Sequence, residues 1–207
     1  MLHSKIDDSL ENGSGFAQDF SEQLLQLWAG APKSGPNIVV LFGVSANAET
    51  SALAAELARF ARIVELSVLL VDANIDGGSQ HEAFGCEQTP GLASALLGKA
   101  AFDDIIQIGD GGLSLIPAGS DSSHSCAMLY QVNVADRLRS LAKSTDLIIV
   151  DASTLNLRAS IQIASGADQA IVVIRRNQSS LRELQAIVEL AGANLPSRPL
   201  VIMADLG

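Results

Sequence analysis

Short apolar runs alternate with segments of helical periodicity along most of this chain. The runs predicted as strands are residues 38–42, 66–71, 113–116, 147–150, 170–174 and 200–203. The segments predicted as helices are about residues 50–62, 91–98, 128–142, 158–165 and 180–192. Strands that are apolar throughout belong in a sheet covered on both faces, and the helices between them can supply that cover. The pattern therefore predicts an α/β fold with a doubly wound, mainly parallel sheet and helices on both faces.

Composition sets the class of protein. Of the 207 residues 48% are apolar, which is enough for one domain with its own core. The formal net charge of −10 disfavours nucleic acid and anionic lipid as partners. No apolar run approaches the roughly 20 residues of a membrane span, and the N-terminus has no apolar signal core. We therefore expect a cytoplasmic protein that does not insert into a membrane and does not bind nucleic acid.

The first 36 residues differ from the rest and are predicted as a polar arm, an amphipathic helix and a linker, followed by the domain at 37–207. Large apolar side chains recur at helical spacing within this region, at Phe16, Phe20, Leu24, Leu27 and Trp28. The stripe either packs on the protein's own sheet or serves as an interaction helix for a partner or a second copy. The candidate interaction residues are Phe20, Leu24 and Trp28.

The segment Leu41–Ser51 lies between the first predicted strand and the first helix of the domain, which is the context of a phosphate-binding loop. The usual pattern is Gly, four residues, then Gly-Lys-Ser/Thr. Here no lysine occurs between Lys33 and Lys99, and no glycine occurs between Gly43 and Gly77. The candidate nucleotide-binding residues of this altered loop are Gly43, Ala48, Glu49, Thr50 and Ser51.

Electrostatics argues against tight nucleotide binding at this loop. The lysine normally neutralises phosphate oxygens, and a unit charge about 4 Å away contributes roughly 4 kcal/mol at an effective dielectric of about 20. Here the cation is missing and Glu49 adds a negative charge. Asn47 could instead cap the following helix, with Glu49 in its first turn. We therefore expect no bound cofactor, with an atypical site for ATP or ADP and Mg²⁺ as the alternative.

Two predicted strands end in aspartate, at Asp72 and Asp151. Ligands of open parallel sheets bind beyond the carboxyl ends of the strands. Together with Ser51, the two carboxylates could hold Mg²⁺. They could equally cap the turns that follow the strands. The candidate metal ligands are Ser51, Asp72 and Asp151, and no residue is predicted to be catalytic.

The order of these motifs resembles the bacterial tyrosine kinases (BY-kinases) of exopolysaccharide systems and the related MinD/ParA-type P-loop proteins. The resemblance covers about residues 16–204. It is carried by the loop segment and by the words 68–76, 91–98, 115–119, 146–151 and 167–175. It implies a P-loop NTPase fold.

Several positions depart from the family pattern. In an ungapped register Thr50 stands at the lysine and Glu49 at the preceding glycine; a second register puts Glu49 at the lysine. Asn74 replaces the second aspartate of the acidic motif and Asp76 its arginine, while Leu25 and Trp28 stand where the oligomerisation arginines would be. Tyr130 is the only tyrosine, so the family's C-terminal tyrosine cluster is not expected.

The departures predict a catalytically degenerate protein that acts as a binding or regulatory subunit, and the resemblance implies a role in exopolysaccharide synthesis or export. Its implied partner is the cytoplasmic segment of an inner-membrane polysaccharide co-polymerase, which would place the protein at that membrane through the partner. A second copy of the chain, in a homo-oligomer, is the other candidate partner. Two alternatives stay open. One is an active ATPase or tyrosine kinase with an atypical loop, and the other is a MinD/ParA-like regulatory factor.

Overall fold

The computed structural model describes residues 35–43, 48–75, 77–120, 132–153, 155–175 and 181–204. Its strands are β1 (Asn37–Gly43), β2 (Val68–Asp72), β3 (Gln107–Ile108), β4 (Ser114–Ile116), β5 (Leu147–Asp151), β6 (Gln169–Arg175) and β7 (Leu200–Ala204). Its α-helices are α3 (Ala48–Ile63), α4 (Gln80–Ala83), α5 (Leu92–Leu96), α7 (Val134–Leu141), α8 (Leu157–Ala164) and α9 (Leu181–Asn194). Two 3-10 turns, Asp103–Ile105 and Asp110–Gly112, flank β3.

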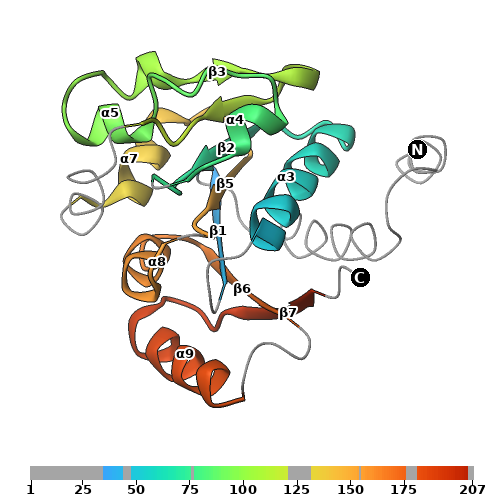
Figure 1. Ribbon diagram of the computed structural model, residues 1–207, viewed down its shortest axis with the longest axis vertical. Helices are drawn as coiled ribbons and strands as arrows, with labels where there is room; N and C mark the ends of the chain where they lie inside the picture. Colours follow the sequence, from blue (N-terminus) through green and yellow to red (C-terminus); the bar gives the residue numbers. More distant parts are fainter. Residues whose placement is uncertain are drawn as a thin grey trace.

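Within these residues the strands form one sheet in the order β3-β4-β2-β5-β1-β6-β7 (Figure 1). Every neighbouring pair is parallel except β3 and β4, which are antiparallel. The connections between the parallel strands run through helices, as parallel pairing requires. The prediction of a doubly wound, mainly parallel α/β sheet is confirmed.

The core has two layers, one on each face of the sheet, because successive strand residues point to opposite faces. On one face Ile38, Val40 and Phe42 of β1 belong to a cluster that includes side chains of α5, α7, α8 and α9. On the other face Val39 and Leu41 belong to a cluster that includes the apolar side of α3. Figure 1 shows α3 across the sheet from α7 and α8. Helices on both faces explain why the strands are apolar throughout.

Some element boundaries differ from the predictions. The predicted strand 66–71 begins only at Val68, because Ser67 is engaged with Asp146, whose Oδ2 accepts from both its backbone N–H and its hydroxyl. The predicted helix 128–142 is wrong at its start among the described residues, since Asn133 caps α7 by accepting from the backbone N–H of Asp136. Residues 128–131 lie outside the described residues. Strand β3 and helix α4 were not predicted.

The division at residue 36 stays a prediction, because residues 1–34 lie outside the described part of the chain. The candidate interaction residues Phe20, Leu24 and Trp28 fall in that region. Among the described helices, none has both the length and the apolar character needed to cross a membrane.

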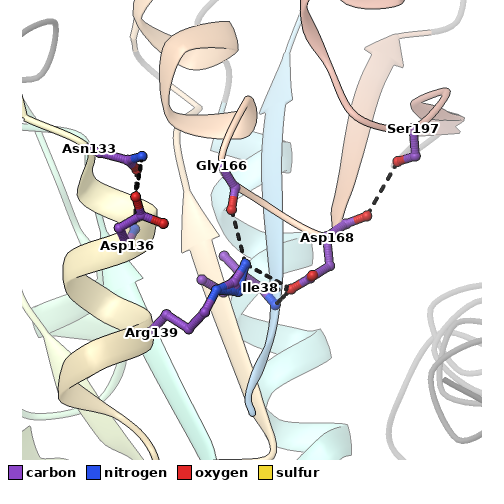
Figure 2. A network of polar contacts seen from close by, with 7 residues as sticks. All are labelled: Ile38, Asn133, Asp136, Arg139, Gly166, Asp168 and Ser197. Atoms are coloured by element: carbon purple, nitrogen blue, oxygen red, sulfur yellow. Dashed lines mark hydrogen bonds and ion pairs between the residues drawn. The ribbon is translucent and has the colours of Figure 1, made fainter. Parts of the chain in front are cut away.

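Asp168, which immediately precedes β6, fastens the amino-terminal edge of the sheet (Figure 2). Its Oδ2 accepts from the backbone N–H of Ile38 at 2.8 Å and lies 3.4 Å from a guanidinium nitrogen of Arg139 on α7. Arg139 also donates to the carbonyl of Gly166 at 3.1 Å, and the Asp168 carbonyl accepts from the Ser197 hydroxyl at 3.3 Å. The network ties β1, β6 and α7 together at the end of the sheet opposite the strand tips.

Replacing Asp168 with alanine is expected to lower the free energy of unfolding by about 1–2 kcal/mol, because the N–H of the fully buried Ile38 loses its side-chain acceptor. Asp168→Asn is the matched variant: it keeps an acceptor for Ile38 but loses the ion pair with Arg139, which is half exposed and contributes little. Urea unfolding should rank Asp168→Ala below Asp168→Asn. Equal losses would mean that the ion pair is the stabilising contact.

Candidate functional site

The carboxyl ends of β1, β2 and β5 lie side by side and bring the two predicted aspartates together. Strand β5 lies between the other two, and in the register of β2 with β5 Asp72 stands directly opposite Asp151. Residues opposite each other in a parallel pair point to the same face. Both aspartates are fully buried. The two carboxylates therefore lie at one edge of the sheet, and their predicted role as metal ligands stays a prediction.

Asp72 is held by the loop that follows its own strand. Its Oδ1 accepts from the backbone N–H of Asn74, and its Oδ2 from the backbone N–H of Gln80, both at 3.0 Å. The loop passes so close that a Cβ atom built on Gly78 would lie 2.4 Å from Asp72 Oδ2. A glycine is therefore needed at position 78 for the loop to wrap around the carboxylate.

Asp151 is held by a side chain from that same loop. Gln80 donates its amide Nε2 to Asp151 Oδ2 at 2.7 Å and to the backbone carbonyl of Ser51 at 2.9 Å. The other carboxylate oxygen accepts from the backbone N–H of Ser153 at 3.1 Å. The hydroxyls of Ser51 and Ser153 are 2.7 Å apart and hydrogen-bonded. One buried amide thus joins the start of α3 to the tip of β5.

The pKa of Asp72 is raised from its ordinary value of 3.8 to about 7, mainly because burial disfavours the charged form and also because of the negative charge of Asp151. The hydrogen bonds from the backbone N–H groups of Gln80 and Asn74 act in the opposite direction, because they favour the ionised carboxylate. Asp72 therefore exchanges its proton near neutral pH. A proton on this carboxyl relieves the repulsion between the two buried acids. Among the described residues, no cationic side chain donates a hydrogen bond to either of them.

The remaining predicted site residues surround the start of α3. Gly43 is the buried last residue of β1, and Ala48 is the first residue of α3. Glu49 and Ser51 are half-buried, and Thr50 is fully buried. Residues 44–47, which include the proposed cap Asn47, lie outside the described residues, as does Asp76. The structure thus brings Ser51, Asp72 and Asp151 into one hydrogen-bonded cluster.

Comparison with curated proteins identifies the relatives of the chain. The putative tyrosine-protein kinase EpsB of Ralstonia nicotianae is 28% identical over 174 residues, which make up 83% of this chain and 23% of EpsB. The putative tyrosine-protein kinase AmsA of Erwinia amylovora is 25% identical over 151 residues, or 72% of this chain and 21% of AmsA. The chain is similar over most of its length to these two proteins named as tyrosine kinases. It spans less than a quarter of the length of these two relatives. No model of a protein family matches the chain.

Solved structures agree on the fold of the chain. The kinase domain of the Escherichia coli tyrosine kinase ETK superposes with a TM-score of 0.79 at 20% identity, covering 90% of this chain and 73% of that one. Cobyrinic acid a,c-diamide synthase from Mycobacterium smegmatis, solved with a bound ATP analogue and magnesium, superposes with a TM-score of 0.67 at 18% identity, covering 81% and 72%. The P-loop NTPase fold predicted from the sequence is confirmed.

The side chains at the strand tips do not fit a magnesium ion as they are arranged. Magnesium prefers a near-octahedral shell of oxygen atoms. Here a nitrogen donor, Nε2 of Gln80, stands between the Ser51 carbonyl and Asp151, and both of its hydrogens point at those oxygens. Among the described residues, no group of three or more His, Cys, Asp or Glu side chains that could hold a metal ion is found, here or elsewhere.

Sequence reasoning missed Gln80 and Gly78 and gave Ser153 no place in the site. No motif marks a glutamine eight residues beyond a strand aspartate as part of a site. The one available signal was the Gly77-Gly78 pair, which indicates a close backbone approach directly after an acidic strand end.

Proposed function

We propose that this chain is a non-hydrolysing, P-loop-type binding or regulatory subunit of an exopolysaccharide synthesis or export system. Its partner would be the cytoplasmic segment of an inner-membrane polysaccharide co-polymerase, so the protein would lie in the cytoplasm, at the membrane only through that partner. The similarity to the tyrosine kinases EpsB and AmsA supports a role in such a system. Another relative is named as a tyrosine-protein kinase in the cps region of Klebsiella pneumoniae.

The non-catalytic part of the proposal rests on one observation: the carboxylate oxygens at the strand tips already accept hydrogen bonds from within the protein. Both oxygens of Asp72 and both of Asp151 accept from donors within the protein. The Ser51 hydroxyl, which a magnesium ion would need, is bonded to Ser153. A nucleotide with its metal would have to displace several of these hydrogen bonds before gaining any of its own.

No nearby basic residue of α3 replaces the missing lysine. Arg59 lies eight residues beyond Ser51, or about 12 Å along a helix. It already contacts Glu56 Oε1 at 2.7 Å and the Ala83 carbonyl at 3.2 Å. Arg62 is further along and donates to the Leu66 carbonyl. Phosphate bound at the start of α3 would therefore meet Glu49 without a compensating cation from this helix.

The alternative is an active ATPase or tyrosine kinase with an atypical loop, using Ser51, Asp72 and Asp151 around Mg²⁺. The clustering of these three residues at the strand tips and the kinase names of the relatives favour it. The MinD/ParA-like alternative is favoured only by the fold, which it shares with MinD of Aquifex aeolicus at a TM-score of 0.64.

One experiment with two arms tests the proposal. In the first, the full chain and the E. coli ETK kinase domain are titrated with Mg·ATP and Mg·ADP and assayed for phosphate transfer. We expect no thermal stabilisation and no transfer for this chain at about 1 mM nucleotide. Binding a hundredfold above the dissociation constant would stabilise by about 2.7 kcal/mol, and a gain of that order, or transfer to protein tyrosine, would establish the enzyme instead.

In the second arm, the full chain is co-expressed with the cytoplasmic segment of the co-polymerase from its own locus. We expect the two to co-purify without nucleotide and Trp28→Ala to weaken the pair. Leu27→Ala, on the same predicted helix, controls for general damage to that stripe. Absence of the pair would reject the proposed partner, and an unaffected pair in the Trp28 variant would reject the interaction helix.

A further inference from the structure

At the strand tips one side chain, Gln80, places a nitrogen donor where a magnesium ion would need oxygen ligands. Its amide nitrogen lies 2.7 Å from Asp151 Oδ2 and 2.9 Å from the Ser51 carbonyl, so both amide hydrogens are used. Its backbone N–H also donates to Asp72 Oδ2 at 3.0 Å. A single residue therefore contacts both strand-tip aspartates and the first turn of α3.

We propose that the Gln80 side chain is a built-in substitute for a divalent cation, which closes the strand-tip site to metal and so to metal-bound nucleotide. The inference rests on the proposed non-hydrolysing function and names the residue that enforces it. An uncharged amide supplies two N–H donors between oxygens that would otherwise repel each other. It therefore holds these oxygens together as a cation would. Because both N–H donors are already used, none is left for a phosphate.

The substitute is fixed in place by its surroundings. Gln80 is 1% exposed and is the first residue of α4. Arg59 of α3 donates to the carbonyl of Ala83, the last residue of α4, and its guanidinium lies 4.6 Å from the centroid of the Phe84 ring. The helix is thus held against α3, and the amide is presented to the carboxylates by a rigid support.

The orientation of the Gln80 amide decides whether the side chain excludes a cation from the site, as a plug, or binds one as a ligand. In the observed orientation Nε2 faces Asp151 and Ser51, while Oε1 is buried without a hydrogen-bond partner among the described residues. Turning the amide over would place Oε1 against the Asp151 carboxylate and the Ser51 carbonyl. Three oxygens facing one another are stable only with a cation or a proton between them. Cation binding therefore requires Gln80 to turn over or to leave.

Gln80→Glu is the sharpest test because it keeps the size of the side chain and replaces the nitrogen with an oxygen. We measure thermal unfolding and Mn²⁺ binding by titration for the full chain, in EDTA and at about 1 mM Mn²⁺. We expect no cation-dependent shift for the wild type. Gln80→Glu should have a lower Tm in EDTA, a Tm that Mn²⁺ raises, and Mn²⁺ affinity at least about tenfold above that of the wild type.

Gln162→Glu is the matched control, because it adds the same charge at an exposed position of α8. It should show no response to Mn²⁺. Gln80→Ala, which removes the plug without adding a ligand, should bind Mn²⁺ more tightly than the wild type and less tightly than Gln80→Glu. If Gln80→Glu fails to fold in EDTA, folding that depends on Mn²⁺ supports the proposal, and if it fails to fold in both conditions, Gln80→Ala decides.

Two results would overturn the proposal. Saturable Mn²⁺ binding by the wild type that Gln80→Ala abolishes would make Gln80 a metal ligand. Folded Gln80 variants that bind Mn²⁺ no better than the wild type would mean that another feature excludes the cation. In the second case a wild type that still binds no nucleotide leaves the proposed function intact, so the two failures are distinguishable.

Discussion

Replacing Gly78 with alanine is expected to lower the free energy of unfolding by about 2–3 kcal/mol, the cost of overpacking a filled interior. The added Cβ would lie 2.4 Å from Asp72 Oδ2 and 2.6 Å from the Ala118 Cβ. Both neighbours are fully buried, so neither can move into open space. The loop must then shift, and the backbone N–H of Gln80 would leave Asp72. Urea unfolding measures the loss.

Gly77→Ala is the matched control, one residue earlier in the same turn. A Cβ atom there would meet nothing within 4 Å, and the residue is exposed. We expect a change within about 0.5 kcal/mol. An equal loss in both variants would show that the turn needs glycine for its backbone freedom and that the contact with Asp72 is not the cause.

The second large effect is a fall in stability with rising pH that originates at Asp72. Its pKa is 3.8 in the unfolded chain and about 7 in the folded protein, so between these values the folded state binds the extra proton. The stabilisation that the protonated Asp72 contributes to the free energy of unfolding is fully present below pH 4 and is lost as the pH rises through 7. Three pKa units correspond to about 4 kcal/mol, an upper bound for this group.

Asp72→Asn should remove this fall, because the variant has no carboxyl to titrate. The substitution also places an amide nitrogen near the backbone N–H donors of Asn74 and Gln80, which lowers stability at every pH. The diagnostic quantity is therefore the slope of unfolding free energy between pH 5 and pH 8, measured by urea unfolding, and not its level. Asp103→Asn, at an exposed position, controls for the loss of one carboxylate. A variant with the wild-type slope would place the titrating group elsewhere.

The sequence predicted the sheet well because its evidence is repeated and local. Every parallel strand was found, since a strand buried on both faces is apolar along its whole length, and Val71-Asp72 and Val150-Asp151 marked two strand ends that the structure places in register. Strand β3 was missed because two residues, Gln107 and Ile108, carry no periodicity. Its pairing depends on β4 and is therefore a tertiary feature.

The site was predictable only in part. The positions of the two aspartates and of Ser51 follow from strand topology. The position of Gln80 depends on the path of the loop after β2. That path is set by the close approach at Gly78 and by the hydrogen bond from Arg59 to α4. These are contacts between residues far apart in the chain, and no spacing rule encodes them. The absence of lysine was visible in the sequence, whereas the amide of Gln80 between Asp151 and the Ser51 carbonyl was not.

Gln80 belongs to helix α4, which Arg59 holds against α3, and this affects how a free ion would compete with the Gln80 amide. A tethered group is present at its target at an effective concentration of the order of millimolar or more, and that concentration does not vary with the medium. If Gln80 takes the place of a cation as proposed, a free ion would have to compete with this effective concentration, and we expect ordinary changes in cellular magnesium or nucleotide to leave the folded protein unchanged. A protein that responds to such changes needs a ligand that can dissociate from the site. Gln80 cannot dissociate, because it is part of the chain.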